Sequence, residues 1–296
     1  MPIPRDPSCI LPFPFATLND IQLAAEINYR TNEKLPFSTY ENITFDYPNF
    51  VDSDGLLSDL DPDIHNPVRT DVIDSKYYDV ESMKQNICNN NVNSLFLFQN
   101  IRTVNENFTM FYECLAKQIL PHANIFGMCE THLTDATECL YNIPGFDLFC
   151  NNYRSDMGGV AIYAKSELCA SIVDDLCISS YETETIFIEI TLNNKKELFG
   201  VVYRRPNSDV DLFISKLEIL LNKVHNTSCN IAGDFNLDLL KYDTNRYVQD
   251  YVEMMFCKGF FPCINRPTRI STKSATLIDH LWCNNTNRLR LNGVLI

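Results

Sequence analysis

The sequence predicts an α/β sandwich, in which mixed β-sheets pack against helices. From about Asn93 onward, short apolar runs alternate with amphipathic stretches, as in the strands and helices of one large globular domain. In the middle of the chain, several predicted strands follow one another without a helix between them. A strict succession of strand, helix and strand would separate them, so layered mixed sheets are favoured.

The predicted elements follow from these patterns in chain order. Apolar runs predict strands at 95–98, 125–129, 159–164, 186–190, 197–203, 229–232 and 275–282. Apolar residues at helical spacing predict three helices, which cover 108–120, 213–224 and 247–255. We expect Ser208 or Asp209 to cap the N-terminus of the second helix, and Gly259 to follow the third in a left-handed conformation.

The first 90 residues differ in composition from the remainder of the chain. They hold nine of the fourteen prolines, and they contain 6 Lys and Arg against 15 Asp and Glu. Proline fixes φ and removes a backbone donor, and dense like charge opposes collapse. We therefore expect an acidic, proline-rich leader over 1–90 that is largely disordered, with a short helix near 18–25 or 80–87. A folded domain is expected over 91–296.

Composition excludes several classes of protein. No apolar run approaches the ~18 residues of a membrane span, and the first residues, MPIPRDPSCI, lack the apolar segment of a signal peptide. We therefore expect an intracellular protein that does not interact with membranes. The twelve cysteines are scattered without a Cys-x-x-Cys pair, which favours free thiols over a zinc site or a disulfide framework.

Polar residues follow the ends of the apolar strands. They are Asn100, Glu130, Tyr203, Asp234 with Asn236, and Asp279. In sheet-based α/β proteins, ligands gather at strand ends. Carboxylate and amide oxygens suit Mg²⁺ rather than zinc, and a tyrosine hydroxyl can donate to a developing oxyanion. The pattern predicts a metal-dependent site.

These residues lie in motifs that resemble a known family. GDFN at 233–236, followed by LDLLKYDT, resembles the motif of the endonuclease/exonuclease/phosphatase superfamily, the DNase-I-like metal nucleases. The other motifs match in family order: FQNIRTV, GMCETHL, GGVAIYAK, GVVYRRP and PTRISTKSATLIDHLW. The likeness is greatest to the apurinic-type endonuclease domain of non-LTR retrotransposons. It implies a four-layer α/β sandwich, with two packed mixed sheets flanked by helices.

The resemblance implies hydrolysis of phosphodiester bonds in double-stranded DNA. Glu130 and Asn100 would bind Mg²⁺, or Mn²⁺ in its place, and Asp234 would orient or deprotonate the attacking water. Asn236 would hydrogen-bond the phosphate, and Tyr203 would stabilise the transition state. In retrotransposition, the nick would expose a 3′ hydroxyl that primes reverse transcription.

The resemblance also carries expectations about partners. Arg204, Arg205, Arg269 and Lys273 are expected to bind the substrate as a basic rim, although the net charge of the chain is −14. We expect no small-molecule cofactor and, by default, a monomer. A DNA substrate would place the active protein in the nucleus.

One departure from the family concerns a catalytic histidine. The resemblance implies that Asp279 orients a histidine from a Ser-Asp-His strand, which in the family lies a short way beyond this motif. The sequence reaches Ile296 about where that strand should begin, so we expect a domain incomplete at its C-terminus, with weak or absent nuclease activity. A truncated element or an incomplete gene model would account for this. His280 is not expected to substitute, because neighbours on a strand point to opposite faces.

Two alternatives remain open beside the endonuclease. One is a catalytically inactive remnant, or a pseudoenzyme that binds DNA or protein. The other keeps the fold but changes the substrate to a nucleotide or an inositol phosphate. The PTR…IDH match favours DNA.

Overall fold

The structure is a computed structural model. It describes residues 43–45, 75–89, 95–119, 122–134, 136–154, 157–192, 195–224, 227–270, 274–285 and 292–295. Most of the expected leader, including the helix expected near 18–25, lies outside these residues.

The first sheet has the strand order β2-β3-β5-β4. Its strands are β2 (Phe96–Asn100), β3 (Ile125–Cys129), β4 (Phe146–Asn151) and β5 (Val160–Lys165). β2 and β3 are parallel, whereas β5 is antiparallel to both β3 and β4. β4 was not among the predicted strands.

A helical segment covers the outer face of the first sheet. It comprises α3 (Val104–Met110), the π-helical turn η3 (Phe111–Ala116) and α4 (Lys117–Ile119), so it begins before the predicted start at residue 108. Phe111 packs edge-on against Phe126 of β3, with the ring centroids 5.6 Å apart. Apolar burial on this face explains why the amphipathic segment folds as a helix here.

The second sheet has the order β11-β14-β10-β9-β8-β6, with β7 beside β8. Its strands are β6 (Ser171–Ile172), β7 (Ile178–Ser179), β8 (Thr183–Leu192), β9 (Lys195–Arg204), β10 (Ser228–Asp234), β11 (Phe261–Pro262) and β14 (Asp279–Cys283). β9 and β10 are parallel, and the other neighbours are antiparallel.

The strand predicted over 275–282 is divided in the structure. β13 (Ala275–Thr276) forms a hairpin with β12 (Arg269–Ile270), and β14 begins only at Asp279. Between them, the chain leaves the sheet because its backbone bonds to the loop after β10. Leu277 N donates to Asp238 Oδ1, and Ile278 O accepts from Phe235 N.

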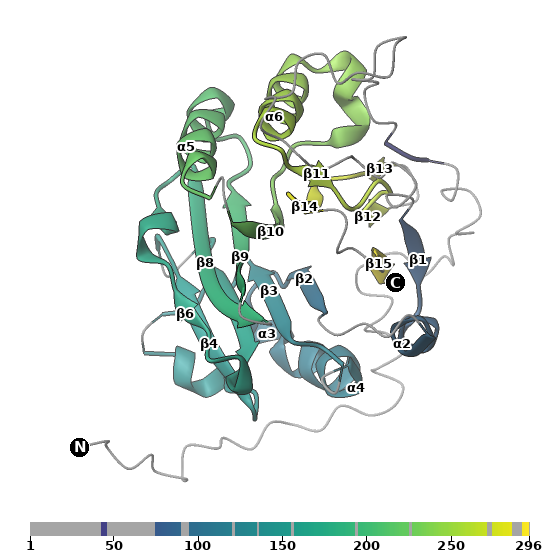
Figure 1. Cartoon of the computed structure of the whole chain (residues 1–296), viewed down its shortest axis with the longest axis vertical. Coiled ribbons are helices and arrows are strands. Elements are labelled where there is room, and N and C mark those ends of the chain that lie inside the picture. The colour runs from purple at the N-terminus through teal and green to yellow at the C-terminus, as the bar shows by residue number, and fades with distance from the viewer. Residues whose placement is uncertain are drawn as a thin grey trace.

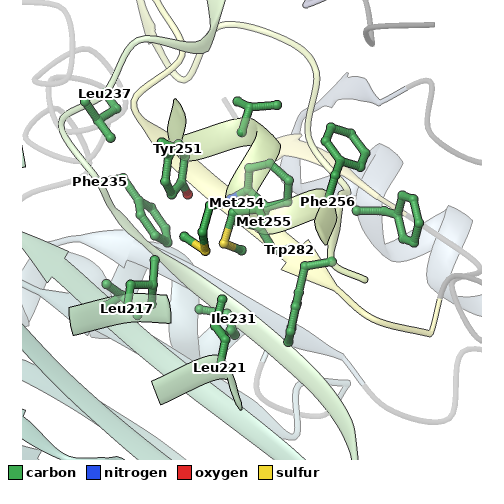
Figure 2. Packing of buried hydrophobic residues seen from close by; sticks show 14 of the residues in the cluster. Leu217, Leu221, Ile231, Phe235, Leu237, Tyr251, Met254, Met255, Phe256 and Trp282 are labelled. Atoms are coloured by element: carbon green, nitrogen blue, oxygen red, sulfur yellow. The ribbon is translucent and has the colours of Figure 1, made fainter. Parts of the chain in front are cut away.

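Helices α5 (Val210–Asn222) and α6 (Arg246–Cys257) cover the outer face of the second sheet. Asp209 caps α5 by accepting a bond from Leu212 N, and Gly259 follows α6 with φ +74°, as predicted. Figure 2 shows the core that these helices share with the sheet, where Leu217 and Leu221 of α5 lie near Ile231 of β10.

Three apolar cores define four layers. One core joins the second sheet to α5 and α6, and another joins the first sheet to α2, α3 and α4. The third consists of residues on facing sides of the two sheets, such as Ile162 and Ile188, both fully buried. Figure 1 shows the two groups of helices on opposite sides of the sheets. The predicted sandwich of packed mixed sheets flanked by helices is therefore confirmed.

The described part of the leader packs on the domain. β1 (Lys76–Tyr78) and α2 (Val80–Asn89) precede the first sheet, and Met83 and Ile87 of α2 are buried in its outer core. β15 (Gly293–Leu295) pairs with β1 in parallel, as Figure 1 shows. Packed structure therefore extends N-terminal to the boundary expected at residue 91.

Short 3₁₀ helices complete the secondary structure of the described residues. They are η4 (Glu138–Tyr141), η5 (Ser166–Leu168), η6 (Asp174–Leu176) and η7 (Leu239–Thr244). Among the helices of the described residues, none combines the length and apolar character that crossing a membrane requires.

Candidate active site

The second sheet places three of the predicted residues side by side. Tyr203 at the end of β9 lies opposite Asp234 of β10, and Asp234 lies opposite Asp279 of β14. Residues at matching positions on neighbouring strands point to the same face. All three side chains therefore face the first sheet, whose strands β2 and β3 end in Asn100 and Cys129, just before Glu130.

The amide of Asn100 joins the two sheets at this point. Its Nδ2 donates to Glu130 Oε1 over 2.7 Å and to Asp234 Oδ2 over 2.6 Å. Glu130 belongs to the loop after β3, and Asp234 ends β10, so a single side chain connects carboxylates from both sheets. The structure thus brings together Asn100, Glu130 and Asp234, as their positions at strand ends suggested.

Strained backbone conformations concentrate around this junction. Among the described residues, seven non-glycine residues have positive φ, and five of them lie in the loops after β2, β3 and β10. They are Arg102, Thr103, Glu130, His132 and Asn236. A non-glycine residue in this region usually costs about 1–3 kcal/mol and persists where surrounding contacts hold it, often at functional sites. The clustering supports an active site here.

Asn236 is held beside Asp234 by two contacts. Its backbone N donates to Asp234 Oδ1 over 3.1 Å, and its side-chain Nδ2 donates to Arg204 O over 2.8 Å. An amide nitrogen carries two hydrogens, so one N–H of the side chain remains for another acceptor.

Asp279 is fixed from one side only. Thr268 Oγ1 donates to Asp279 Oδ2 over 2.9 Å and accepts from Asp279 N over 3.1 Å. The other carboxylate oxygen, Oδ1, is buried and has no hydrogen-bond partner among the described residues. A buried oxygen without a donor is unfavourable, so this atom is available to a further hydrogen-bond donor.

His280 points away from the site, as predicted. Its ring stacks on Phe235 at 4.8 Å and lies 5.7 Å from Tyr251 in the core beneath α6. The side chain is 2% exposed, and burial lowers its pKa to about 4. His280 is therefore a neutral core residue, and it cannot supply the histidine that the resemblance places beside Asp279.

Two carboxylates of the site, Asp234 and Asp279, hold protons more tightly than usual. Burial, followed by the neighbouring charge of Asp279, raises the pKa of Asp234 to about 7, against the opposing effect of Arg269. Burial also raises the pKa of Asp279, which Thr268 and Arg269 partly offset. Burial raises the pKa of Tyr203, which remains a neutral proton donor. Two neighbouring acids that disfavour each other's charge would both be stabilised as carboxylates by a bound cation.

The raised pKa of Asp234 predicts that the metal-free protein loses stability with rising pH. Its folded value of about 7 exceeds the ordinary 3.8, so between these values the folded chain holds more proton than the unfolded chain. The linked stabilisation falls as pH rises toward 7, by on the order of 2–4 kcal/mol. Urea unfolding in EDTA at pH 5 and pH 8 measures this loss.

Asp234→Asn provides the comparison for that measurement. The buried His280 contributes an opposite slope below pH 6.5, but it is common to both proteins and cancels in the difference. We expect the free energy of unfolding of the variant to fall less between pH 5 and pH 8. Equal falls in both proteins would contradict the assignment of the proton to Asp234.

Arg204 does not bind substrate in this arrangement, contrary to expectation. Its side chain is 4% exposed and points to the face opposite Tyr203, toward Phe213 of α5. Its guanidinium donates five hydrogen bonds, to Phe235 O, Asn236 O, Arg205 O and both Ser208 O and Ser208 Oγ. The alternation of side chains along β9 accounts for this orientation, and it makes Arg204 a support for two loops of the site.

Arg205 occupies a different environment from its neighbour. It is 8% exposed, and its guanidinium lies 4.4 Å over the ring of Tyr181, whose own exposed fraction is 51%. Neither terminal nitrogen has a hydrogen-bond partner among the described residues. Its charge acts on Tyr203 and Glu184, which places the guanidinium beside the row of site residues.

Two further arginines act on the carboxylates, one from the hairpin of β12 and β13 and one from the loop after β2. Arg269, exposed on β12, lowers the pKa of both Asp234 and Asp279. Arg102, exposed in the loop after β2, also lowers the pKa of Asp279. Arg102 was not among the predicted substrate-binding residues, although it is the only charged residue of the FQNIRTV motif. Lys273 lies outside the described residues.

Glu184 is a second residue that the sequence reasoning missed. It lies opposite Tyr203 on β8, is 1% exposed, and accepts from Tyr153 N over 2.6 Å and from Gly159 N over 3.0 Å. A Cβ on Gly158 would come within 2.1 Å of its carboxylate, and both glycines have positive φ. The Gly158–Gly159 pair therefore permits a loop to close on a buried glutamate beside the site.

The residues present fit a hard divalent cation. Glu130 offers a carboxylate, and half a turn of the Asn100 amide would present Oδ1 in place of Nδ2. The described residues contain no group of three or more His, Cys, Asp or Glu side chains arranged to hold a metal ion. Mg²⁺ commonly uses one or two carboxylates together with water and substrate phosphate, so the smaller donor set is compatible with it. His132 bonds Thr103 Oγ1 through Nδ1 over 3.0 Å.

Comparison with known proteins gives one family match. The sequence profile of the Endonuclease/Exonuclease/phosphatase family matches residues 86–295, well over half of the chain. A search of curated proteins finds no match.

The solved structures that match this chain share little sequence with it. The endonuclease domain of TRAS1, a telomere-specific non-LTR retrotransposon, is 13% identical with a TM-score of 0.47, over 64% of this chain and 84% of that chain. A family protein from Bacteroides thetaiotaomicron is 15% identical with a TM-score of 0.45, over 64% and 80%. A humanized D. rerio TDP2 is 14% identical with a TM-score of 0.46, over 66% and 83%.

Proposed function

Because the chain belongs to the Endonuclease/Exonuclease/phosphatase family, we propose that it hydrolyses phosphodiester bonds of double-stranded DNA with Mg²⁺, or with Mn²⁺ in its place. The product would be a nick that exposes a 3′ hydroxyl, as retrotransposition requires. A DNA substrate would place this activity in the nucleus.

The observation that carries the proposal is the junction of the two sheets. The Asn100 amide contacts Glu130 and Asp234 at once, and Tyr203 and Asp279 flank Asp234 in the same row. The positively charged side chains next to these acids are Arg102 and Arg269. An acidic centre with a basic surround suits a phosphodiester, because the centre attracts a cation and the surround attracts phosphate.

Each side chain has a role that its surroundings support. Asp234 would accept a proton from the water whose oxygen bonds to phosphorus, and a pKa of about 7 suits a general base at neutral pH. As the bond from phosphorus to the 3′ oxygen breaks, that oxygen takes up a proton and leaves as a hydroxyl. Tyr203 and the remaining N–H of Asn236 would donate to oxygens of the phosphate.

Glu130 and Asn100 would hold the cation, which when bound supplies charge neutralisation at the scissile phosphate. Asp279 would orient a proton-carrying group through its buried Oδ1. Since His280 faces the core, this group is not supplied by the neighbouring residue, and we expect cleavage to be slow.

The buried and the exposed arginines of the site would contact different phosphates of the substrate. Arg205 has two buried terminal NH₂ groups without partners among the described residues, and a planar guanidinium can bind two oxygens of one phosphate. Arg102 and Arg269 are exposed and would contact neighbouring phosphates. The overall charge of −14 does not oppose this arrangement, because screening limits distant charges to roughly 10 Å.

Removal of either exposed arginine should weaken DNA binding in a salt-dependent manner. Removing one arginine–phosphate interaction lowers the slope of log Kd against log salt by about 1. We therefore expect Arg102→Ala and Arg269→Ala each to reduce the slope, as measured by fluorescence anisotropy with a labelled duplex from low to moderate salt. Arg246→Ala is the control, because Arg246 lies at the exposed start of α6 and pairs with Asp250. An equal effect in the control would contradict the assignment.

Plasmid nicking tests the proposal directly. Purified chain with supercoiled DNA and Mg²⁺ should generate open circles, and EDTA should prevent their formation. Folded protein that binds the plasmid without cutting it would instead favour a binding module without catalysis. Release of phosphate from nucleotides or inositol phosphates, with plasmid left intact, would favour the phosphatase alternative.

A further inference from the structure

The N-terminal segment outside the family match contacts the loop that fixes Asp279. The family match begins at residue 86, whereas Phe45 and 75–78 precede it. The loop in question, Cys263–Thr268, runs from β11 toward β12 and is called here the support loop. Its last residue, Thr268, makes both hydrogen bonds that hold Asp279.

Ser75 is the centre of the contact. It is fully buried, and its backbone N and its Oγ both donate to Asn265 Oδ1, over 3.1 and 2.6 Å. Its Oγ also accepts from Asn265 N over 3.1 Å. Asn265 is 7% exposed, so loss of Ser75 would leave a buried amide without these partners, which is costly.

Further contacts continue along the same loop. Arg266 Nε donates to Ser75 O, and Tyr77 Oη donates to Pro267 O over 3.0 Å, immediately before Thr268. Phe45 N donates to Asn265 O over 2.7 Å, and the Phe45 side chain is buried in the core of the second sheet. The support loop thus receives much of its hydrogen bonding from the N-terminal segment.

Strand pairing holds that segment in place. β1 pairs in parallel with β15, with Lys76 opposite Gly293. A Cβ on Gly293 would lie 2.3 Å from Lys76 O, so the pairing requires glycine. Asn292, just before β15, donates from Nδ2 to Cys263 O over 2.7 Å at the start of the support loop.

We propose that Ser75–Tyr78 is a positioning element of the active site, which holds the support loop so that Thr268 fixes the carboxylate of Asp279. Ser75 is a positioning residue, since it acts through Asn265 and Thr268 and touches no reacting group. Two experiments test this role. Hydrogen exchange measures the hold on the loop and is independent of the proposed function, whereas nicking kinetics rest on the proposed function.

Hydrogen exchange of the full chain tests the hold on the loop. Ser75→Ala removes two of the three bonds with Asn265, and we expect amides in 263–270 and 277–281 to exchange about tenfold faster. Amides of β3 and β5 should exchange at the normal rate. Ser75→Thr retains the hydroxyl and should restore protection. Ser82→Ala is the matched control, because Ser82 lies in the first turn of α2, where its Oγ donates to Asp79 O.

Nicking kinetics test the consequence for catalysis. Ser75→Ala should lower kcat about tenfold with little change in KM, and combination with Thr268→Val should add little further loss, because both act on Asp279. Should Ser75→Ala fail to fold, Gly293→Ala displaces β1 by a backbone clash and should show the same local exchange.

The outcomes separate the two claims. Unchanged exchange over 263–281, or faster exchange spread equally over β3 and β5, would overturn the positioning role whether or not the chain cuts DNA. Local acceleration in a chain that never nicks would support the hold on Asp279 and refute the proposed nuclease instead.

Discussion

Asp234→Asn is expected to reduce Mg²⁺-dependent nicking by about 10²–10⁴-fold, the usual contribution of a general base. The substitution keeps the shape of the side chain but leaves a single oxygen, which can accept from Asn100 or from Asn236, and it removes the proton acceptor. Initial rates of open-circle formation at saturating Mg²⁺ and pH 7.5 measure the effect.

The control for Asp234→Asn is Asp209→Asn. Asp209 caps α5 on the outer face of the second sheet, and asparagine is an equally good N-cap, so both stability and nicking should be unchanged. The two variants share the same change of charge and the same purification. Nicking that persists equally in both would identify a contaminating nuclease or a different base, and either result would contradict the role of Asp234.

Arg204→Met is expected to destabilise the fold by about 3–5 kcal/mol, the usual cost of breaking a buried charged network. Its guanidinium donates to five oxygens in the loops after β9 and β10, and each of them would lose this donor, although Arg205 O would keep its bonds from Ser208. In a domain of this size, the melting temperature should fall by roughly 10 °C, as scanning calorimetry measures.

Arg205→Met is the matched control on the adjacent residue. Because neither terminal nitrogen of Arg205 has a partner among the described residues, replacement by methionine should leave the melting temperature nearly unchanged. The same replacement should weaken DNA binding if Arg205 receives a phosphate. A large loss of stability in Arg205→Met, or none in Arg204→Met, would reverse the roles that the structure gives to the two arginines.

The contrast between these arginines shows which features of the site the local sequence pattern predicts and which it does not. Apolar runs located most strands, and polar residues at their ends located Asn100, Glu130 and Asp234, because burial and strand direction are local properties. The same alternation that turned His280 from the site also turns Arg204 from it, since Tyr203 faces inward. Alternation along β9 and β14 therefore accounts for the orientation of both side chains.

Other features depend on interactions that local pattern does not contain. Ser75 bonds Asn265, a partner 190 positions away in sequence. The burial of Glu184 depends on the loop at Gly158–Gly159, which donates a backbone bond to its carboxylate. β4 lacks a continuous apolar run, and the register of its pairing with β5 makes it a strand. The division of 275–282 arises from bonds to the loop after β10.

The pairing of β1 with β15 has a consequence for folding on the ribosome. β1 leaves the exit tunnel early, but its partner at Gly293 is translated last among the described strands. At about 5–20 residues per second, β1 waits roughly 10–40 s for that partner. Closure of so long a loop is slow, so this pairing is expected to form late. The nascent chain would therefore build both sheets before β1 and β15 pair, and a ribosome-bound precursor would be folded while the support loop still lacks its contacts with the N-terminal segment.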